Sequence, residues 1–219
     1  MELGRAALLE LEKRRCAVDP AYWLEHWVVT KDEADAVNPF KRFPAPGSKP
    51  HLYLLVDRWL RYPLLLVPKS RRMMCTWTFL LLYGWDSAFH DGRHNFVGSK
   101  KEDDAGFLLD KLEFVFEPMV EKGLLSPYKR KREPHLIEFK ERHSLIQGIA
   151  SGPDQLRQYT ASGLLLDEVA FHQDLKATLG ACMATILGGG RATLVSSVLA
   201  GSDFQDLVHG TADDLVEAA

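Results

Sequence analysis

Two apolar runs that each end in charged residues constrain this chain more than any other feature. The run 163–166 is Gly-Leu-Leu-Leu and leads directly into Asp167 and Glu168. The run 63–67 is Pro-Leu-Leu-Leu-Val and leads into the basic stretch 68–76. Short apolar runs with polar ends are typical of buried strands. A basic loop facing two carboxylates at the carboxyl edge of one sheet would suit a triphosphate and its Mg²⁺.

The rest of the chain alternates helical and extended patterns. Helices are expected at 3–15, 21–27, 49–61, 75–85, about 101–122 and about 174–187. Strands are expected at 63–67, 94–98, 135–139, 144–149, 163–167 and 192–198, and the third and fourth of these could form a hairpin. This alternation predicts an α/β fold with a mostly parallel central sheet flanked by helices. The turn-rich segment 38–47 is interpreted as a surface linker.

Composition excludes several classes of protein. The chain has 219 residues, of which 46% are hydrophobic, so it can bury one sizeable core. Its longest uncharged apolar stretch near the loop, 76–85, is about half of a bilayer span, and residues 1–5 open no secretory signal. We therefore expect a soluble, cytoplasmic protein. The net charge of −3 argues against a histone-like protein, and the three dispersed cysteines indicate reduced thiols.

The basic stretch only partly follows the phosphate-loop pattern G-x-x-x-x-G-K-[ST]. Thr76 is placed to hold a metal, but Pro68 or Lys69 stands at the first glycine, Met74 at the second and Cys75 at the lysine. If the second position needs a positive φ, methionine would be strained there. A solvated basic turn is the alternative. The nucleotide-binding residues expected here are Lys69, Ser70, Arg71, Arg72, Met73, Met74, Cys75 and Thr76.

This arrangement resembles the phosphate loop of the terminase large subunits of tailed bacteriophages, which pump DNA into capsids. In that family the lysine can sit at the start of the loop, as Lys69 does, and an arginine such as Arg71 lies inside it. The resemblance implies a RecA-like P-loop NTPase fold and ATP with Mg²⁺ as ligands. It also implies that Lys69 and Arg71 act in catalysis, and it extends from about residue 20 to 204.

Other segments match the same family. Asp167 would hold Mg²⁺ together with Thr76, partly through water, and Glu168 would be the catalytic carboxylate. Arg157 resembles an arginine finger that reaches a neighbouring subunit's ATP. Ser197, with its neighbour at 196, matches a coupling motif that senses the γ-phosphate. The alternatives are a helix N-cap for the acidic pair, a surface ion pair for the arginine and strand-end caps for the serines.

The family resemblance also sets the expected domains and partners. Residues 1–48 would be a helical arm and linker, 49–203 the ATPase core, and 204–219 the start of a linker to a nuclease domain that this chain lacks. We expect a double-stranded DNA translocase in the host cytoplasm that works with a portal protein and a small terminase subunit. On the procapsid it would form a homo-oligomeric ring, expected to be a pentamer, whereas the isolated chain could be a monomer.

Three points stay open from the sequence. Tyr53 or Arg58 could contact the adenine, although Tyr53 also suits the core. The basic cluster 129–132 could meet DNA phosphates or be a solvated loop. Two alternative functions remain: that of a helicase-like translocase, and that of a degenerate scaffold that binds no nucleotide.

Overall fold

A computed structural model describes residues 2–32, 34–99, 102–150, 161–172 and 175–210. Its helices are α1 (Glu2–Val18), α2 (Pro20–Trp27), α3 (Pro50–Arg61), α4 (Cys75–Phe89), α5 (Glu102–Glu121), α7 (Leu175–Leu187) and α8 (Asp203–His209), with short 3₁₀ turns η1 (Lys140–Arg142) and η2 (Val169–Phe171). Its strands are β1 (Val29–Lys31), β2 (Phe40–Arg42), β3 (Leu64–Lys69), β4 (His94–Ser99), β5 (Lys129–Arg132), β6 (His135–Phe139), β7 (Ser144–Ala150), β8 (Gly163–Asp167) and β9 (Arg191–Ser197).

The central sheet has the strand order β3-β9-β8-β4-β7-β6-β5 in the described part of the chain. The first five strands in this order are parallel to their neighbours, and β6 and β5 are antiparallel additions at one edge. This confirms the predicted α/β fold with a mostly parallel sheet. The expected hairpin also forms, because β6 pairs with β7 in antiparallel register.

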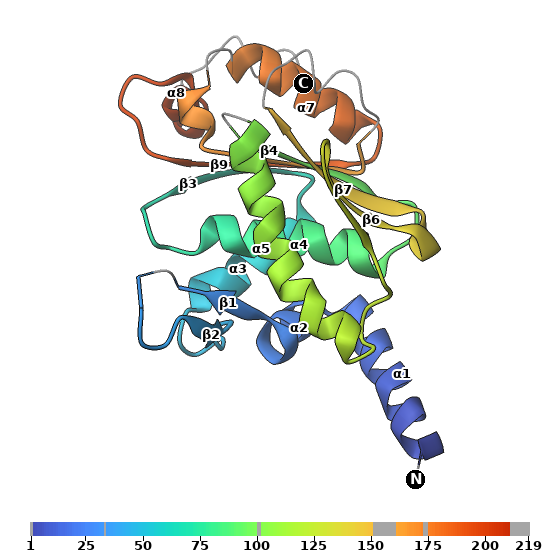
Figure 1. Cartoon of the computed structure of the whole chain (residues 1–219). Coiled ribbons are helices and arrows are strands. Elements are labelled where there is room, and N and C mark those ends of the chain that lie inside the picture. Colours follow the sequence, from blue (N-terminus) through green and yellow to red (C-terminus); the bar gives the residue numbers. More distant parts are fainter. Residues whose placement is uncertain (1, 33, 100–101, 151–160, 173–174, 211–219) are drawn as a thin grey trace.

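Helices cover both faces of the sheet, as Figure 1 shows: α7 and α8 lie on one side and α3 and α4 on the other. Successive strand residues alternate between these two faces. In β8, Leu165 belongs to the core under α4, whereas Leu164 and Leu166 belong to the core under α7. A strand with two covered faces must be apolar at every position, which explains the continuous leucine run.

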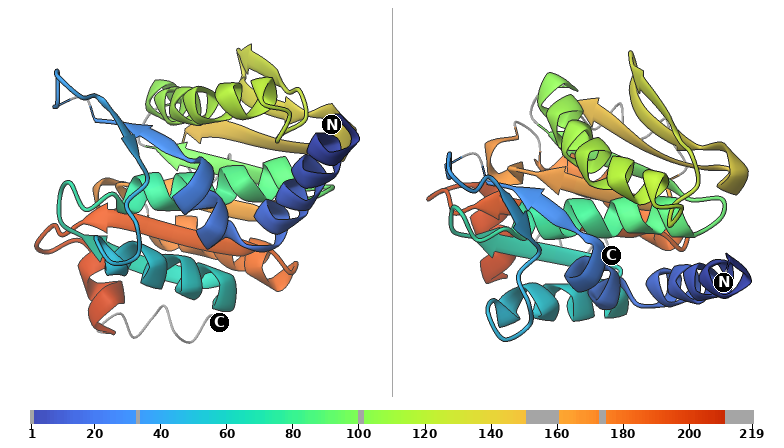
Figure 2. Two further views of the ribbon diagram at one scale, coloured as in Figure 1. Left: turned by 90° about the horizontal axis from the view of Figure 1, so that it is seen from below. Right: turned by 60° about the horizontal axis from the view of Figure 1, so that its bottom comes forward.

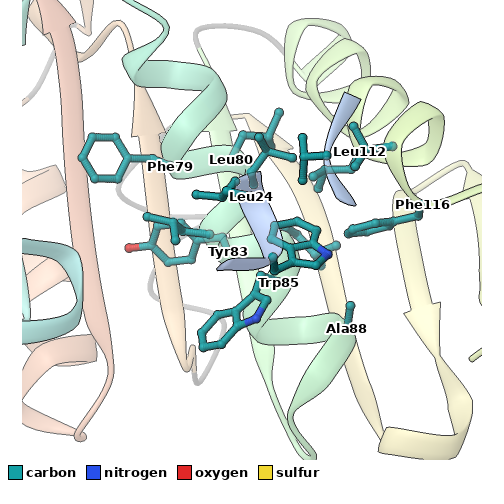
Figure 3. Close-up of a cluster of buried hydrophobic side chains, with 14 of the residues drawn as sticks. Leu24, Phe79, Leu80, Tyr83, Trp85, Ala88, Leu112 and Phe116 are labelled. Carbon is teal, nitrogen blue, oxygen red and sulfur yellow. The ribbon is translucent and has the colours of Figure 1, made fainter. Parts of the chain in front are cut away.

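The larger core lies around α4, whose residues from Thr78 to Phe89 are all buried. Figure 3 shows Phe79, Leu80, Tyr83 and Trp85 of this helix packed among side chains from other elements. The helix follows directly after the basic loop. Its burial along almost its whole length therefore fixes the position of the loop relative to the sheet.

The N-terminal segment differs from the helical arm and linker that the sequence predicts. After α1 and α2, strands β1 and β2 pair as an antiparallel ribbon, with Val29 opposite Arg42. Part of the expected linker 38–47 is thus the strand β2. Figure 2 shows this ribbon on the same side of the molecule as the loop that follows β3, while α1 extends away from the body. The expected boundaries at residues 48 and 203 stay predictions.

No helix in the described ranges is both long enough and apolar enough to cross a membrane.

Candidate functional site

The basic loop joins the end of β3 to the first turn of α4. Arg72 and Met74 in this loop have φ angles of 63° and 58°, in the left-handed region that glycine adopts freely. Met74 stands where the phosphate-loop pattern has its second glycine, and its positive φ is the strained conformation considered above for methionine at that position. A left-handed conformation costs a residue with a side chain about 1–2 kcal/mol. The loop therefore keeps this backbone shape against a steric penalty.

The loop and the acidic pair meet at the carboxyl edge of the sheet. Strand β9 lies between β3 and β8, with Ser197 beside Lys69 in the register. The Thr76 hydroxyl donates a hydrogen bond to Asp167 Oδ1 at 3.0 Å. Lys69 Nζ donates to Glu168 Oε1 at 2.9 Å and lies 3.9 Å from Asp167 Oδ1. The two segments, about 90 residues apart in sequence, thus form one polar site.

The end of β9 completes the surroundings of Glu168. The Ser197 hydroxyl and its backbone N–H contact Glu168 Oε2 at 3.3 and 3.4 Å. Ser196 Oγ accepts a hydrogen bond from the Ala170 N–H at 3.0 Å and lies 3.5 Å from Glu168 Oε2. The serines are therefore more than caps of their own strand, because they link β9 to the segment that carries the acidic pair.

The two adjacent carboxyl groups have pKa values displaced in opposite directions. Burial raises the pKa of Asp167, and this effect outweighs the opposing influence of Lys69 and the Thr76 hydrogen bond. Burial also acts to raise the pKa of Glu168, but the ion pair with Lys69 and the contacts with Ser197 together lower it by more. The pKa of Glu168 therefore lies below its ordinary value. Glu168 is thus ionised at neutral pH, whereas the charge on Asp167 is disfavoured until a cation approaches.

A cavity of about 710 Å³ opens beside this site. The β3–α4 loop and the start of α4 form one wall, and the β1–β2 ribbon, the segment before α3 and one side chain of α5 form the rest. The lining residues are Thr30, Lys31, Asp32, Ala34, Lys41, Arg42, Pro44, Ser48, Lys49, Lys69, Ser70, Arg72, Met73, Met74, Cys75, Thr76, Trp77 and Lys111.

Most of the predicted loop residues line this cavity, but some candidates do not. Arg71 is exposed and is not among the lining residues, and Arg157 lies outside the described residues. The two adenine candidates, Tyr53 and Arg58, are not among the lining residues either. The Tyr53 hydroxyl donates to the Pro44 carbonyl at 2.9 Å, and the Arg58 guanidinium lies 5.8 Å from the centre of the Tyr62 ring.

The basic residues that the N-terminal segment and α5 contribute to the cavity were not predicted as site residues from the sequence. Lys31 and Arg42 come from the β1–β2 ribbon, Lys49 from the segment before α3, and Lys111 from α5. The β-branched run 28–30, Val-Val-Thr, is the one local signal that indicates a strand there.

The cluster 129–132 is the edge strand β5 rather than a loop, and its charges are largely paired. Arg130 binds Asp110 at 2.7 Å, and its side chain is only 7% exposed. Arg132 binds Glu113 at 2.8 Å. Because α5 supplies both carboxylates, this part of the surface carries less free positive charge than its sequence indicates.

No protein-family model matches the sequence, and no curated protein matches it. Among solved structures, the chain is similar to an arginine-to-alanine variant of the large terminase ATPase domain of Thermus phage P74-26, at 15% identity and a TM-score of 0.57, over 73% of this chain and 70% of that one. It is also similar to the large terminase of bacteriophage HK97, at 12% identity and a TM-score of 0.62, over 92% of this chain. The match spans 41% of the HK97 protein. The chain therefore has the fold of the ATPase domain of phage large terminases.

Proposed function

We propose that this chain hydrolyses ATP and that hydrolysis drives double-stranded viral DNA into a procapsid. One observation carries the proposal: the β3–α4 loop and the acidic pair after β8 meet through Thr76–Asp167 and Lys69–Glu168 contacts of 3.0 and 2.9 Å. The cavity beside them is large enough for a nucleoside triphosphate. The shared fold with terminase ATPase domains supports the same reading.

Thr76 and Asp167 fit a magnesium site. Both offer oxygen atoms, which Mg²⁺ prefers, and Mg²⁺ commonly takes one or two carboxylates together with the phosphates of its substrate. No group of three or more ligating side chains gathers among the described residues, which suits a metal that arrives with a nucleotide. Bound Mg²⁺ would neutralise charge on the β- and γ-phosphate oxygens.

We assign the remaining site residues their proposed roles in hydrolysis from their contacts and from the family resemblance. Glu168 is ionised and would orient the attacking water or accept its proton. Lys69 pairs with Glu168 here but also lines the cavity, so it would leave Glu168 for the phosphates when a nucleotide binds. Ser197 contacts Glu168 and would report the state of the γ-phosphate to the rest of the molecule. Arg71 and Arg157 would stabilise the transferring phosphoryl group, the latter in a neighbouring subunit.

The proposed partners rest on the family resemblance. They are double-stranded DNA, a portal protein, a small terminase subunit and further copies of this chain in a ring, in the host cytoplasm. The ring is what would let Arg157 of one subunit complete the site of the next.

The decisive experiment compares ATP hydrolysis by the wild type, Glu168→Gln and Glu117→Gln, in which an exposed glutamate of α5 is changed instead. We expect Glu168→Gln to lower kcat by about 10²–10⁴-fold, as the loss of a general base does, while nucleotide affinity is retained. Glu117→Gln should behave as the wild type. Activity that rises more steeply than protein concentration would support sites shared between subunits. A wild type that binds no nucleotide in the presence of Mg²⁺ would favour the scaffold alternative.

A further inference from the structure

We infer that Lys49, which belongs to neither predicted motif, is a phosphate-binding residue of this site. The inference rests on the proposed function and adds a residue from outside the β3–α4 loop. Among the residues that the structure describes, the cavity is lined by seven lysine or arginine residues and by one acidic residue, Asp32. Such a surplus fits a ligand with several negative charges.

Several of these cations already have partners. Lys69 is paired with Glu168 and Asp167. Lys41, on the ribbon, bridges Asp32 and Asp35 at 3.1 and 2.9 Å. At the position of the usual phosphate-loop lysine, the buried Cys75 thiol carries no charge, and burial raises its pKa. Positive charge for the phosphates must therefore come in part from other residues of the wall.

Lys49 lies outside the β3–α4 loop but contacts it. Its Nζ lies 3.4 Å from Met74 Sδ, directly before the first turn of α4. A thioether is a weak acceptor and cannot neutralise an ammonium group. No ion pair joins Lys49 to a carboxylate within the described ranges. Its charge is thus held, half-buried and unbalanced, where the phosphates are expected to bind.

The backbone around Lys49 is fixed, so little ordering is needed on binding. The N–H groups of Ser48 and Lys49 both donate to the Ala45 carbonyl, at 2.9 and 3.2 Å. In the first turn of α3, His51 Nε2 lies 3.2 Å from the Met73 carbonyl, which ties the same helix to the loop a second time. A positioned cation contributes more to affinity than one that must be ordered.

Lys49 also occupies a place that is unfavourable for lysine. It is the N-cap residue of α3, its side chain makes no capping hydrogen bond, and no acidic residue lies in the first turn. Ser, Thr, Asp and Asn are the residues that stabilise an N-cap, and a cation there faces the positive end of the helix dipole. A residue that opposes the stability of its own helix is expected at a functional site. A bound phosphate would reverse this unfavourable interaction.

The test measures binding of MgATP, MgADP, AMP and inorganic tripolyphosphate to the full chain by calorimetry. Lys49→Ser removes the cation and supplies a capping oxygen, Lys49→Arg keeps the charge, and Lys122→Ser removes an exposed lysine elsewhere. We expect Lys49→Ser to bind MgATP and tripolyphosphate about 10- to 100-fold more weakly, the loss of a charged hydrogen bond, with AMP little affected. Its thermal midpoint without ligand should rise by roughly 2–4 °C. Lys49→Arg and Lys122→Ser should bind as the wild type does.

Three results would overturn the assignment: unchanged MgATP affinity in Lys49→Ser, an equal loss for AMP and ATP, or a lower midpoint with weaker binding of every ligand. The probes also separate this inference from the proposed function. If the wild type binds tripolyphosphate but not ATP, and Lys49→Ser loses that binding, the ATPase proposal fails while the role of Lys49 stands. If the wild type binds ATP and Lys49→Ser binds it equally well, the role of Lys49 fails while the ATPase proposal stands. Binding of neither ligand by the wild type overturns both.

Discussion

Asp167 and Glu168 are adjacent in sequence, yet their surroundings differ. Asp167 ends a buried strand and contacts the Thr76 hydroxyl, whereas Glu168 lies in a left-handed conformation and turns toward Lys69 and Ser197. Burial is the largest single influence on both pKa values, but at Glu168 the ion pair with Lys69 and the contacts with Ser197 together outweigh it, so the two pKa values move apart. Neighbouring titratable groups with separated pKa values are typical of sites that use each group differently, which supports the different roles proposed for Asp167 and Glu168.

These opposite pKa shifts predict opposite effects on stability. The raised pKa of Asp167 means that its ionised form weakens the fold at neutral pH, so Asp167→Asn should be more stable than the wild type there. That advantage should shrink as the pH falls through the raised pKa toward the ordinary value of 3.8, because the wild-type carboxyl then becomes neutral too. Urea denaturation at a series of pH values in the absence of nucleotide measures this.

Glu168→Gln is the matched comparison. The lowered pKa of Glu168 gives stability that is present above its ordinary value of 4.5 and lost as the pH falls through the lowered pKa. Glu168→Gln should therefore be less stable than the wild type at neutral pH, and the difference should close in acid. The same sign of effect for both variants would contradict the opposite directions of the two pKa shifts.

The β3–α4 loop is the element whose conformation departs most from what its sequence favours. Met73 and Met74 are neighbours of the same type, but only Met74 has a positive φ. Glycine should therefore be tolerated better at 74 than at 73, by about 1–2 kcal/mol in the free energy of unfolding, although Met74 is the more buried of the two. Chemical denaturation of Met74→Gly and Met73→Gly gives this difference. A larger loss for Met74→Gly would mean that its side-chain packing outweighs the backbone penalty.

The parallel strands and the helices between them could be predicted from sequence because each is specified locally. A strand with two covered faces is a continuous apolar run, and 163–167 shows this directly. The contact between Thr76 and Asp167 could be predicted from the topology of such a sheet and from the family resemblance. These features needed no knowledge of distant contacts beyond the order of the elements.

The ribbon and β5 could not be predicted in the same way. Strands β1 and β2 have three residues each and are stabilised by each other across a long connection. Strand β5 consists of four cations, a composition that favours a loop, and it is stabilised by Asp110 and Glu113 of α5. Lys49 has no local signature either, because its importance depends on a cavity built from five separate segments.

At the scale of the whole molecule, the N-terminal segment shares a core with the sheet. Cys16, Trp23 and Leu24 belong to the same cluster of buried side chains as Phe79 of α4 and Leu165 of β8. Trp23 is fully buried, its ring lies edge-on to Phe89, and its Nε1 donates to Met119 Sδ at 3.4 Å. These shared contacts lead us to expect that the N-terminal segment unfolds together with the sheet.

Truncating Trp23 should therefore unfold the sheet as well as the N-terminal helices. We expect Trp23→Ala to lower the free energy of unfolding by about 3–5 kcal/mol, as loss of a large core side chain does. Leu11→Ala, at a position 63% exposed on α1, should stay within about 0.5 kcal/mol of the wild type. Hydrogen exchange of amides in β8 and α2 measures both regions at once. If protection fell in α2 while β8 kept the wild-type rate, residues 1–48 would fold separately. Loss of protection in both would mean that the N-terminal wall of the cavity and its β3–α4 loop form and unfold together.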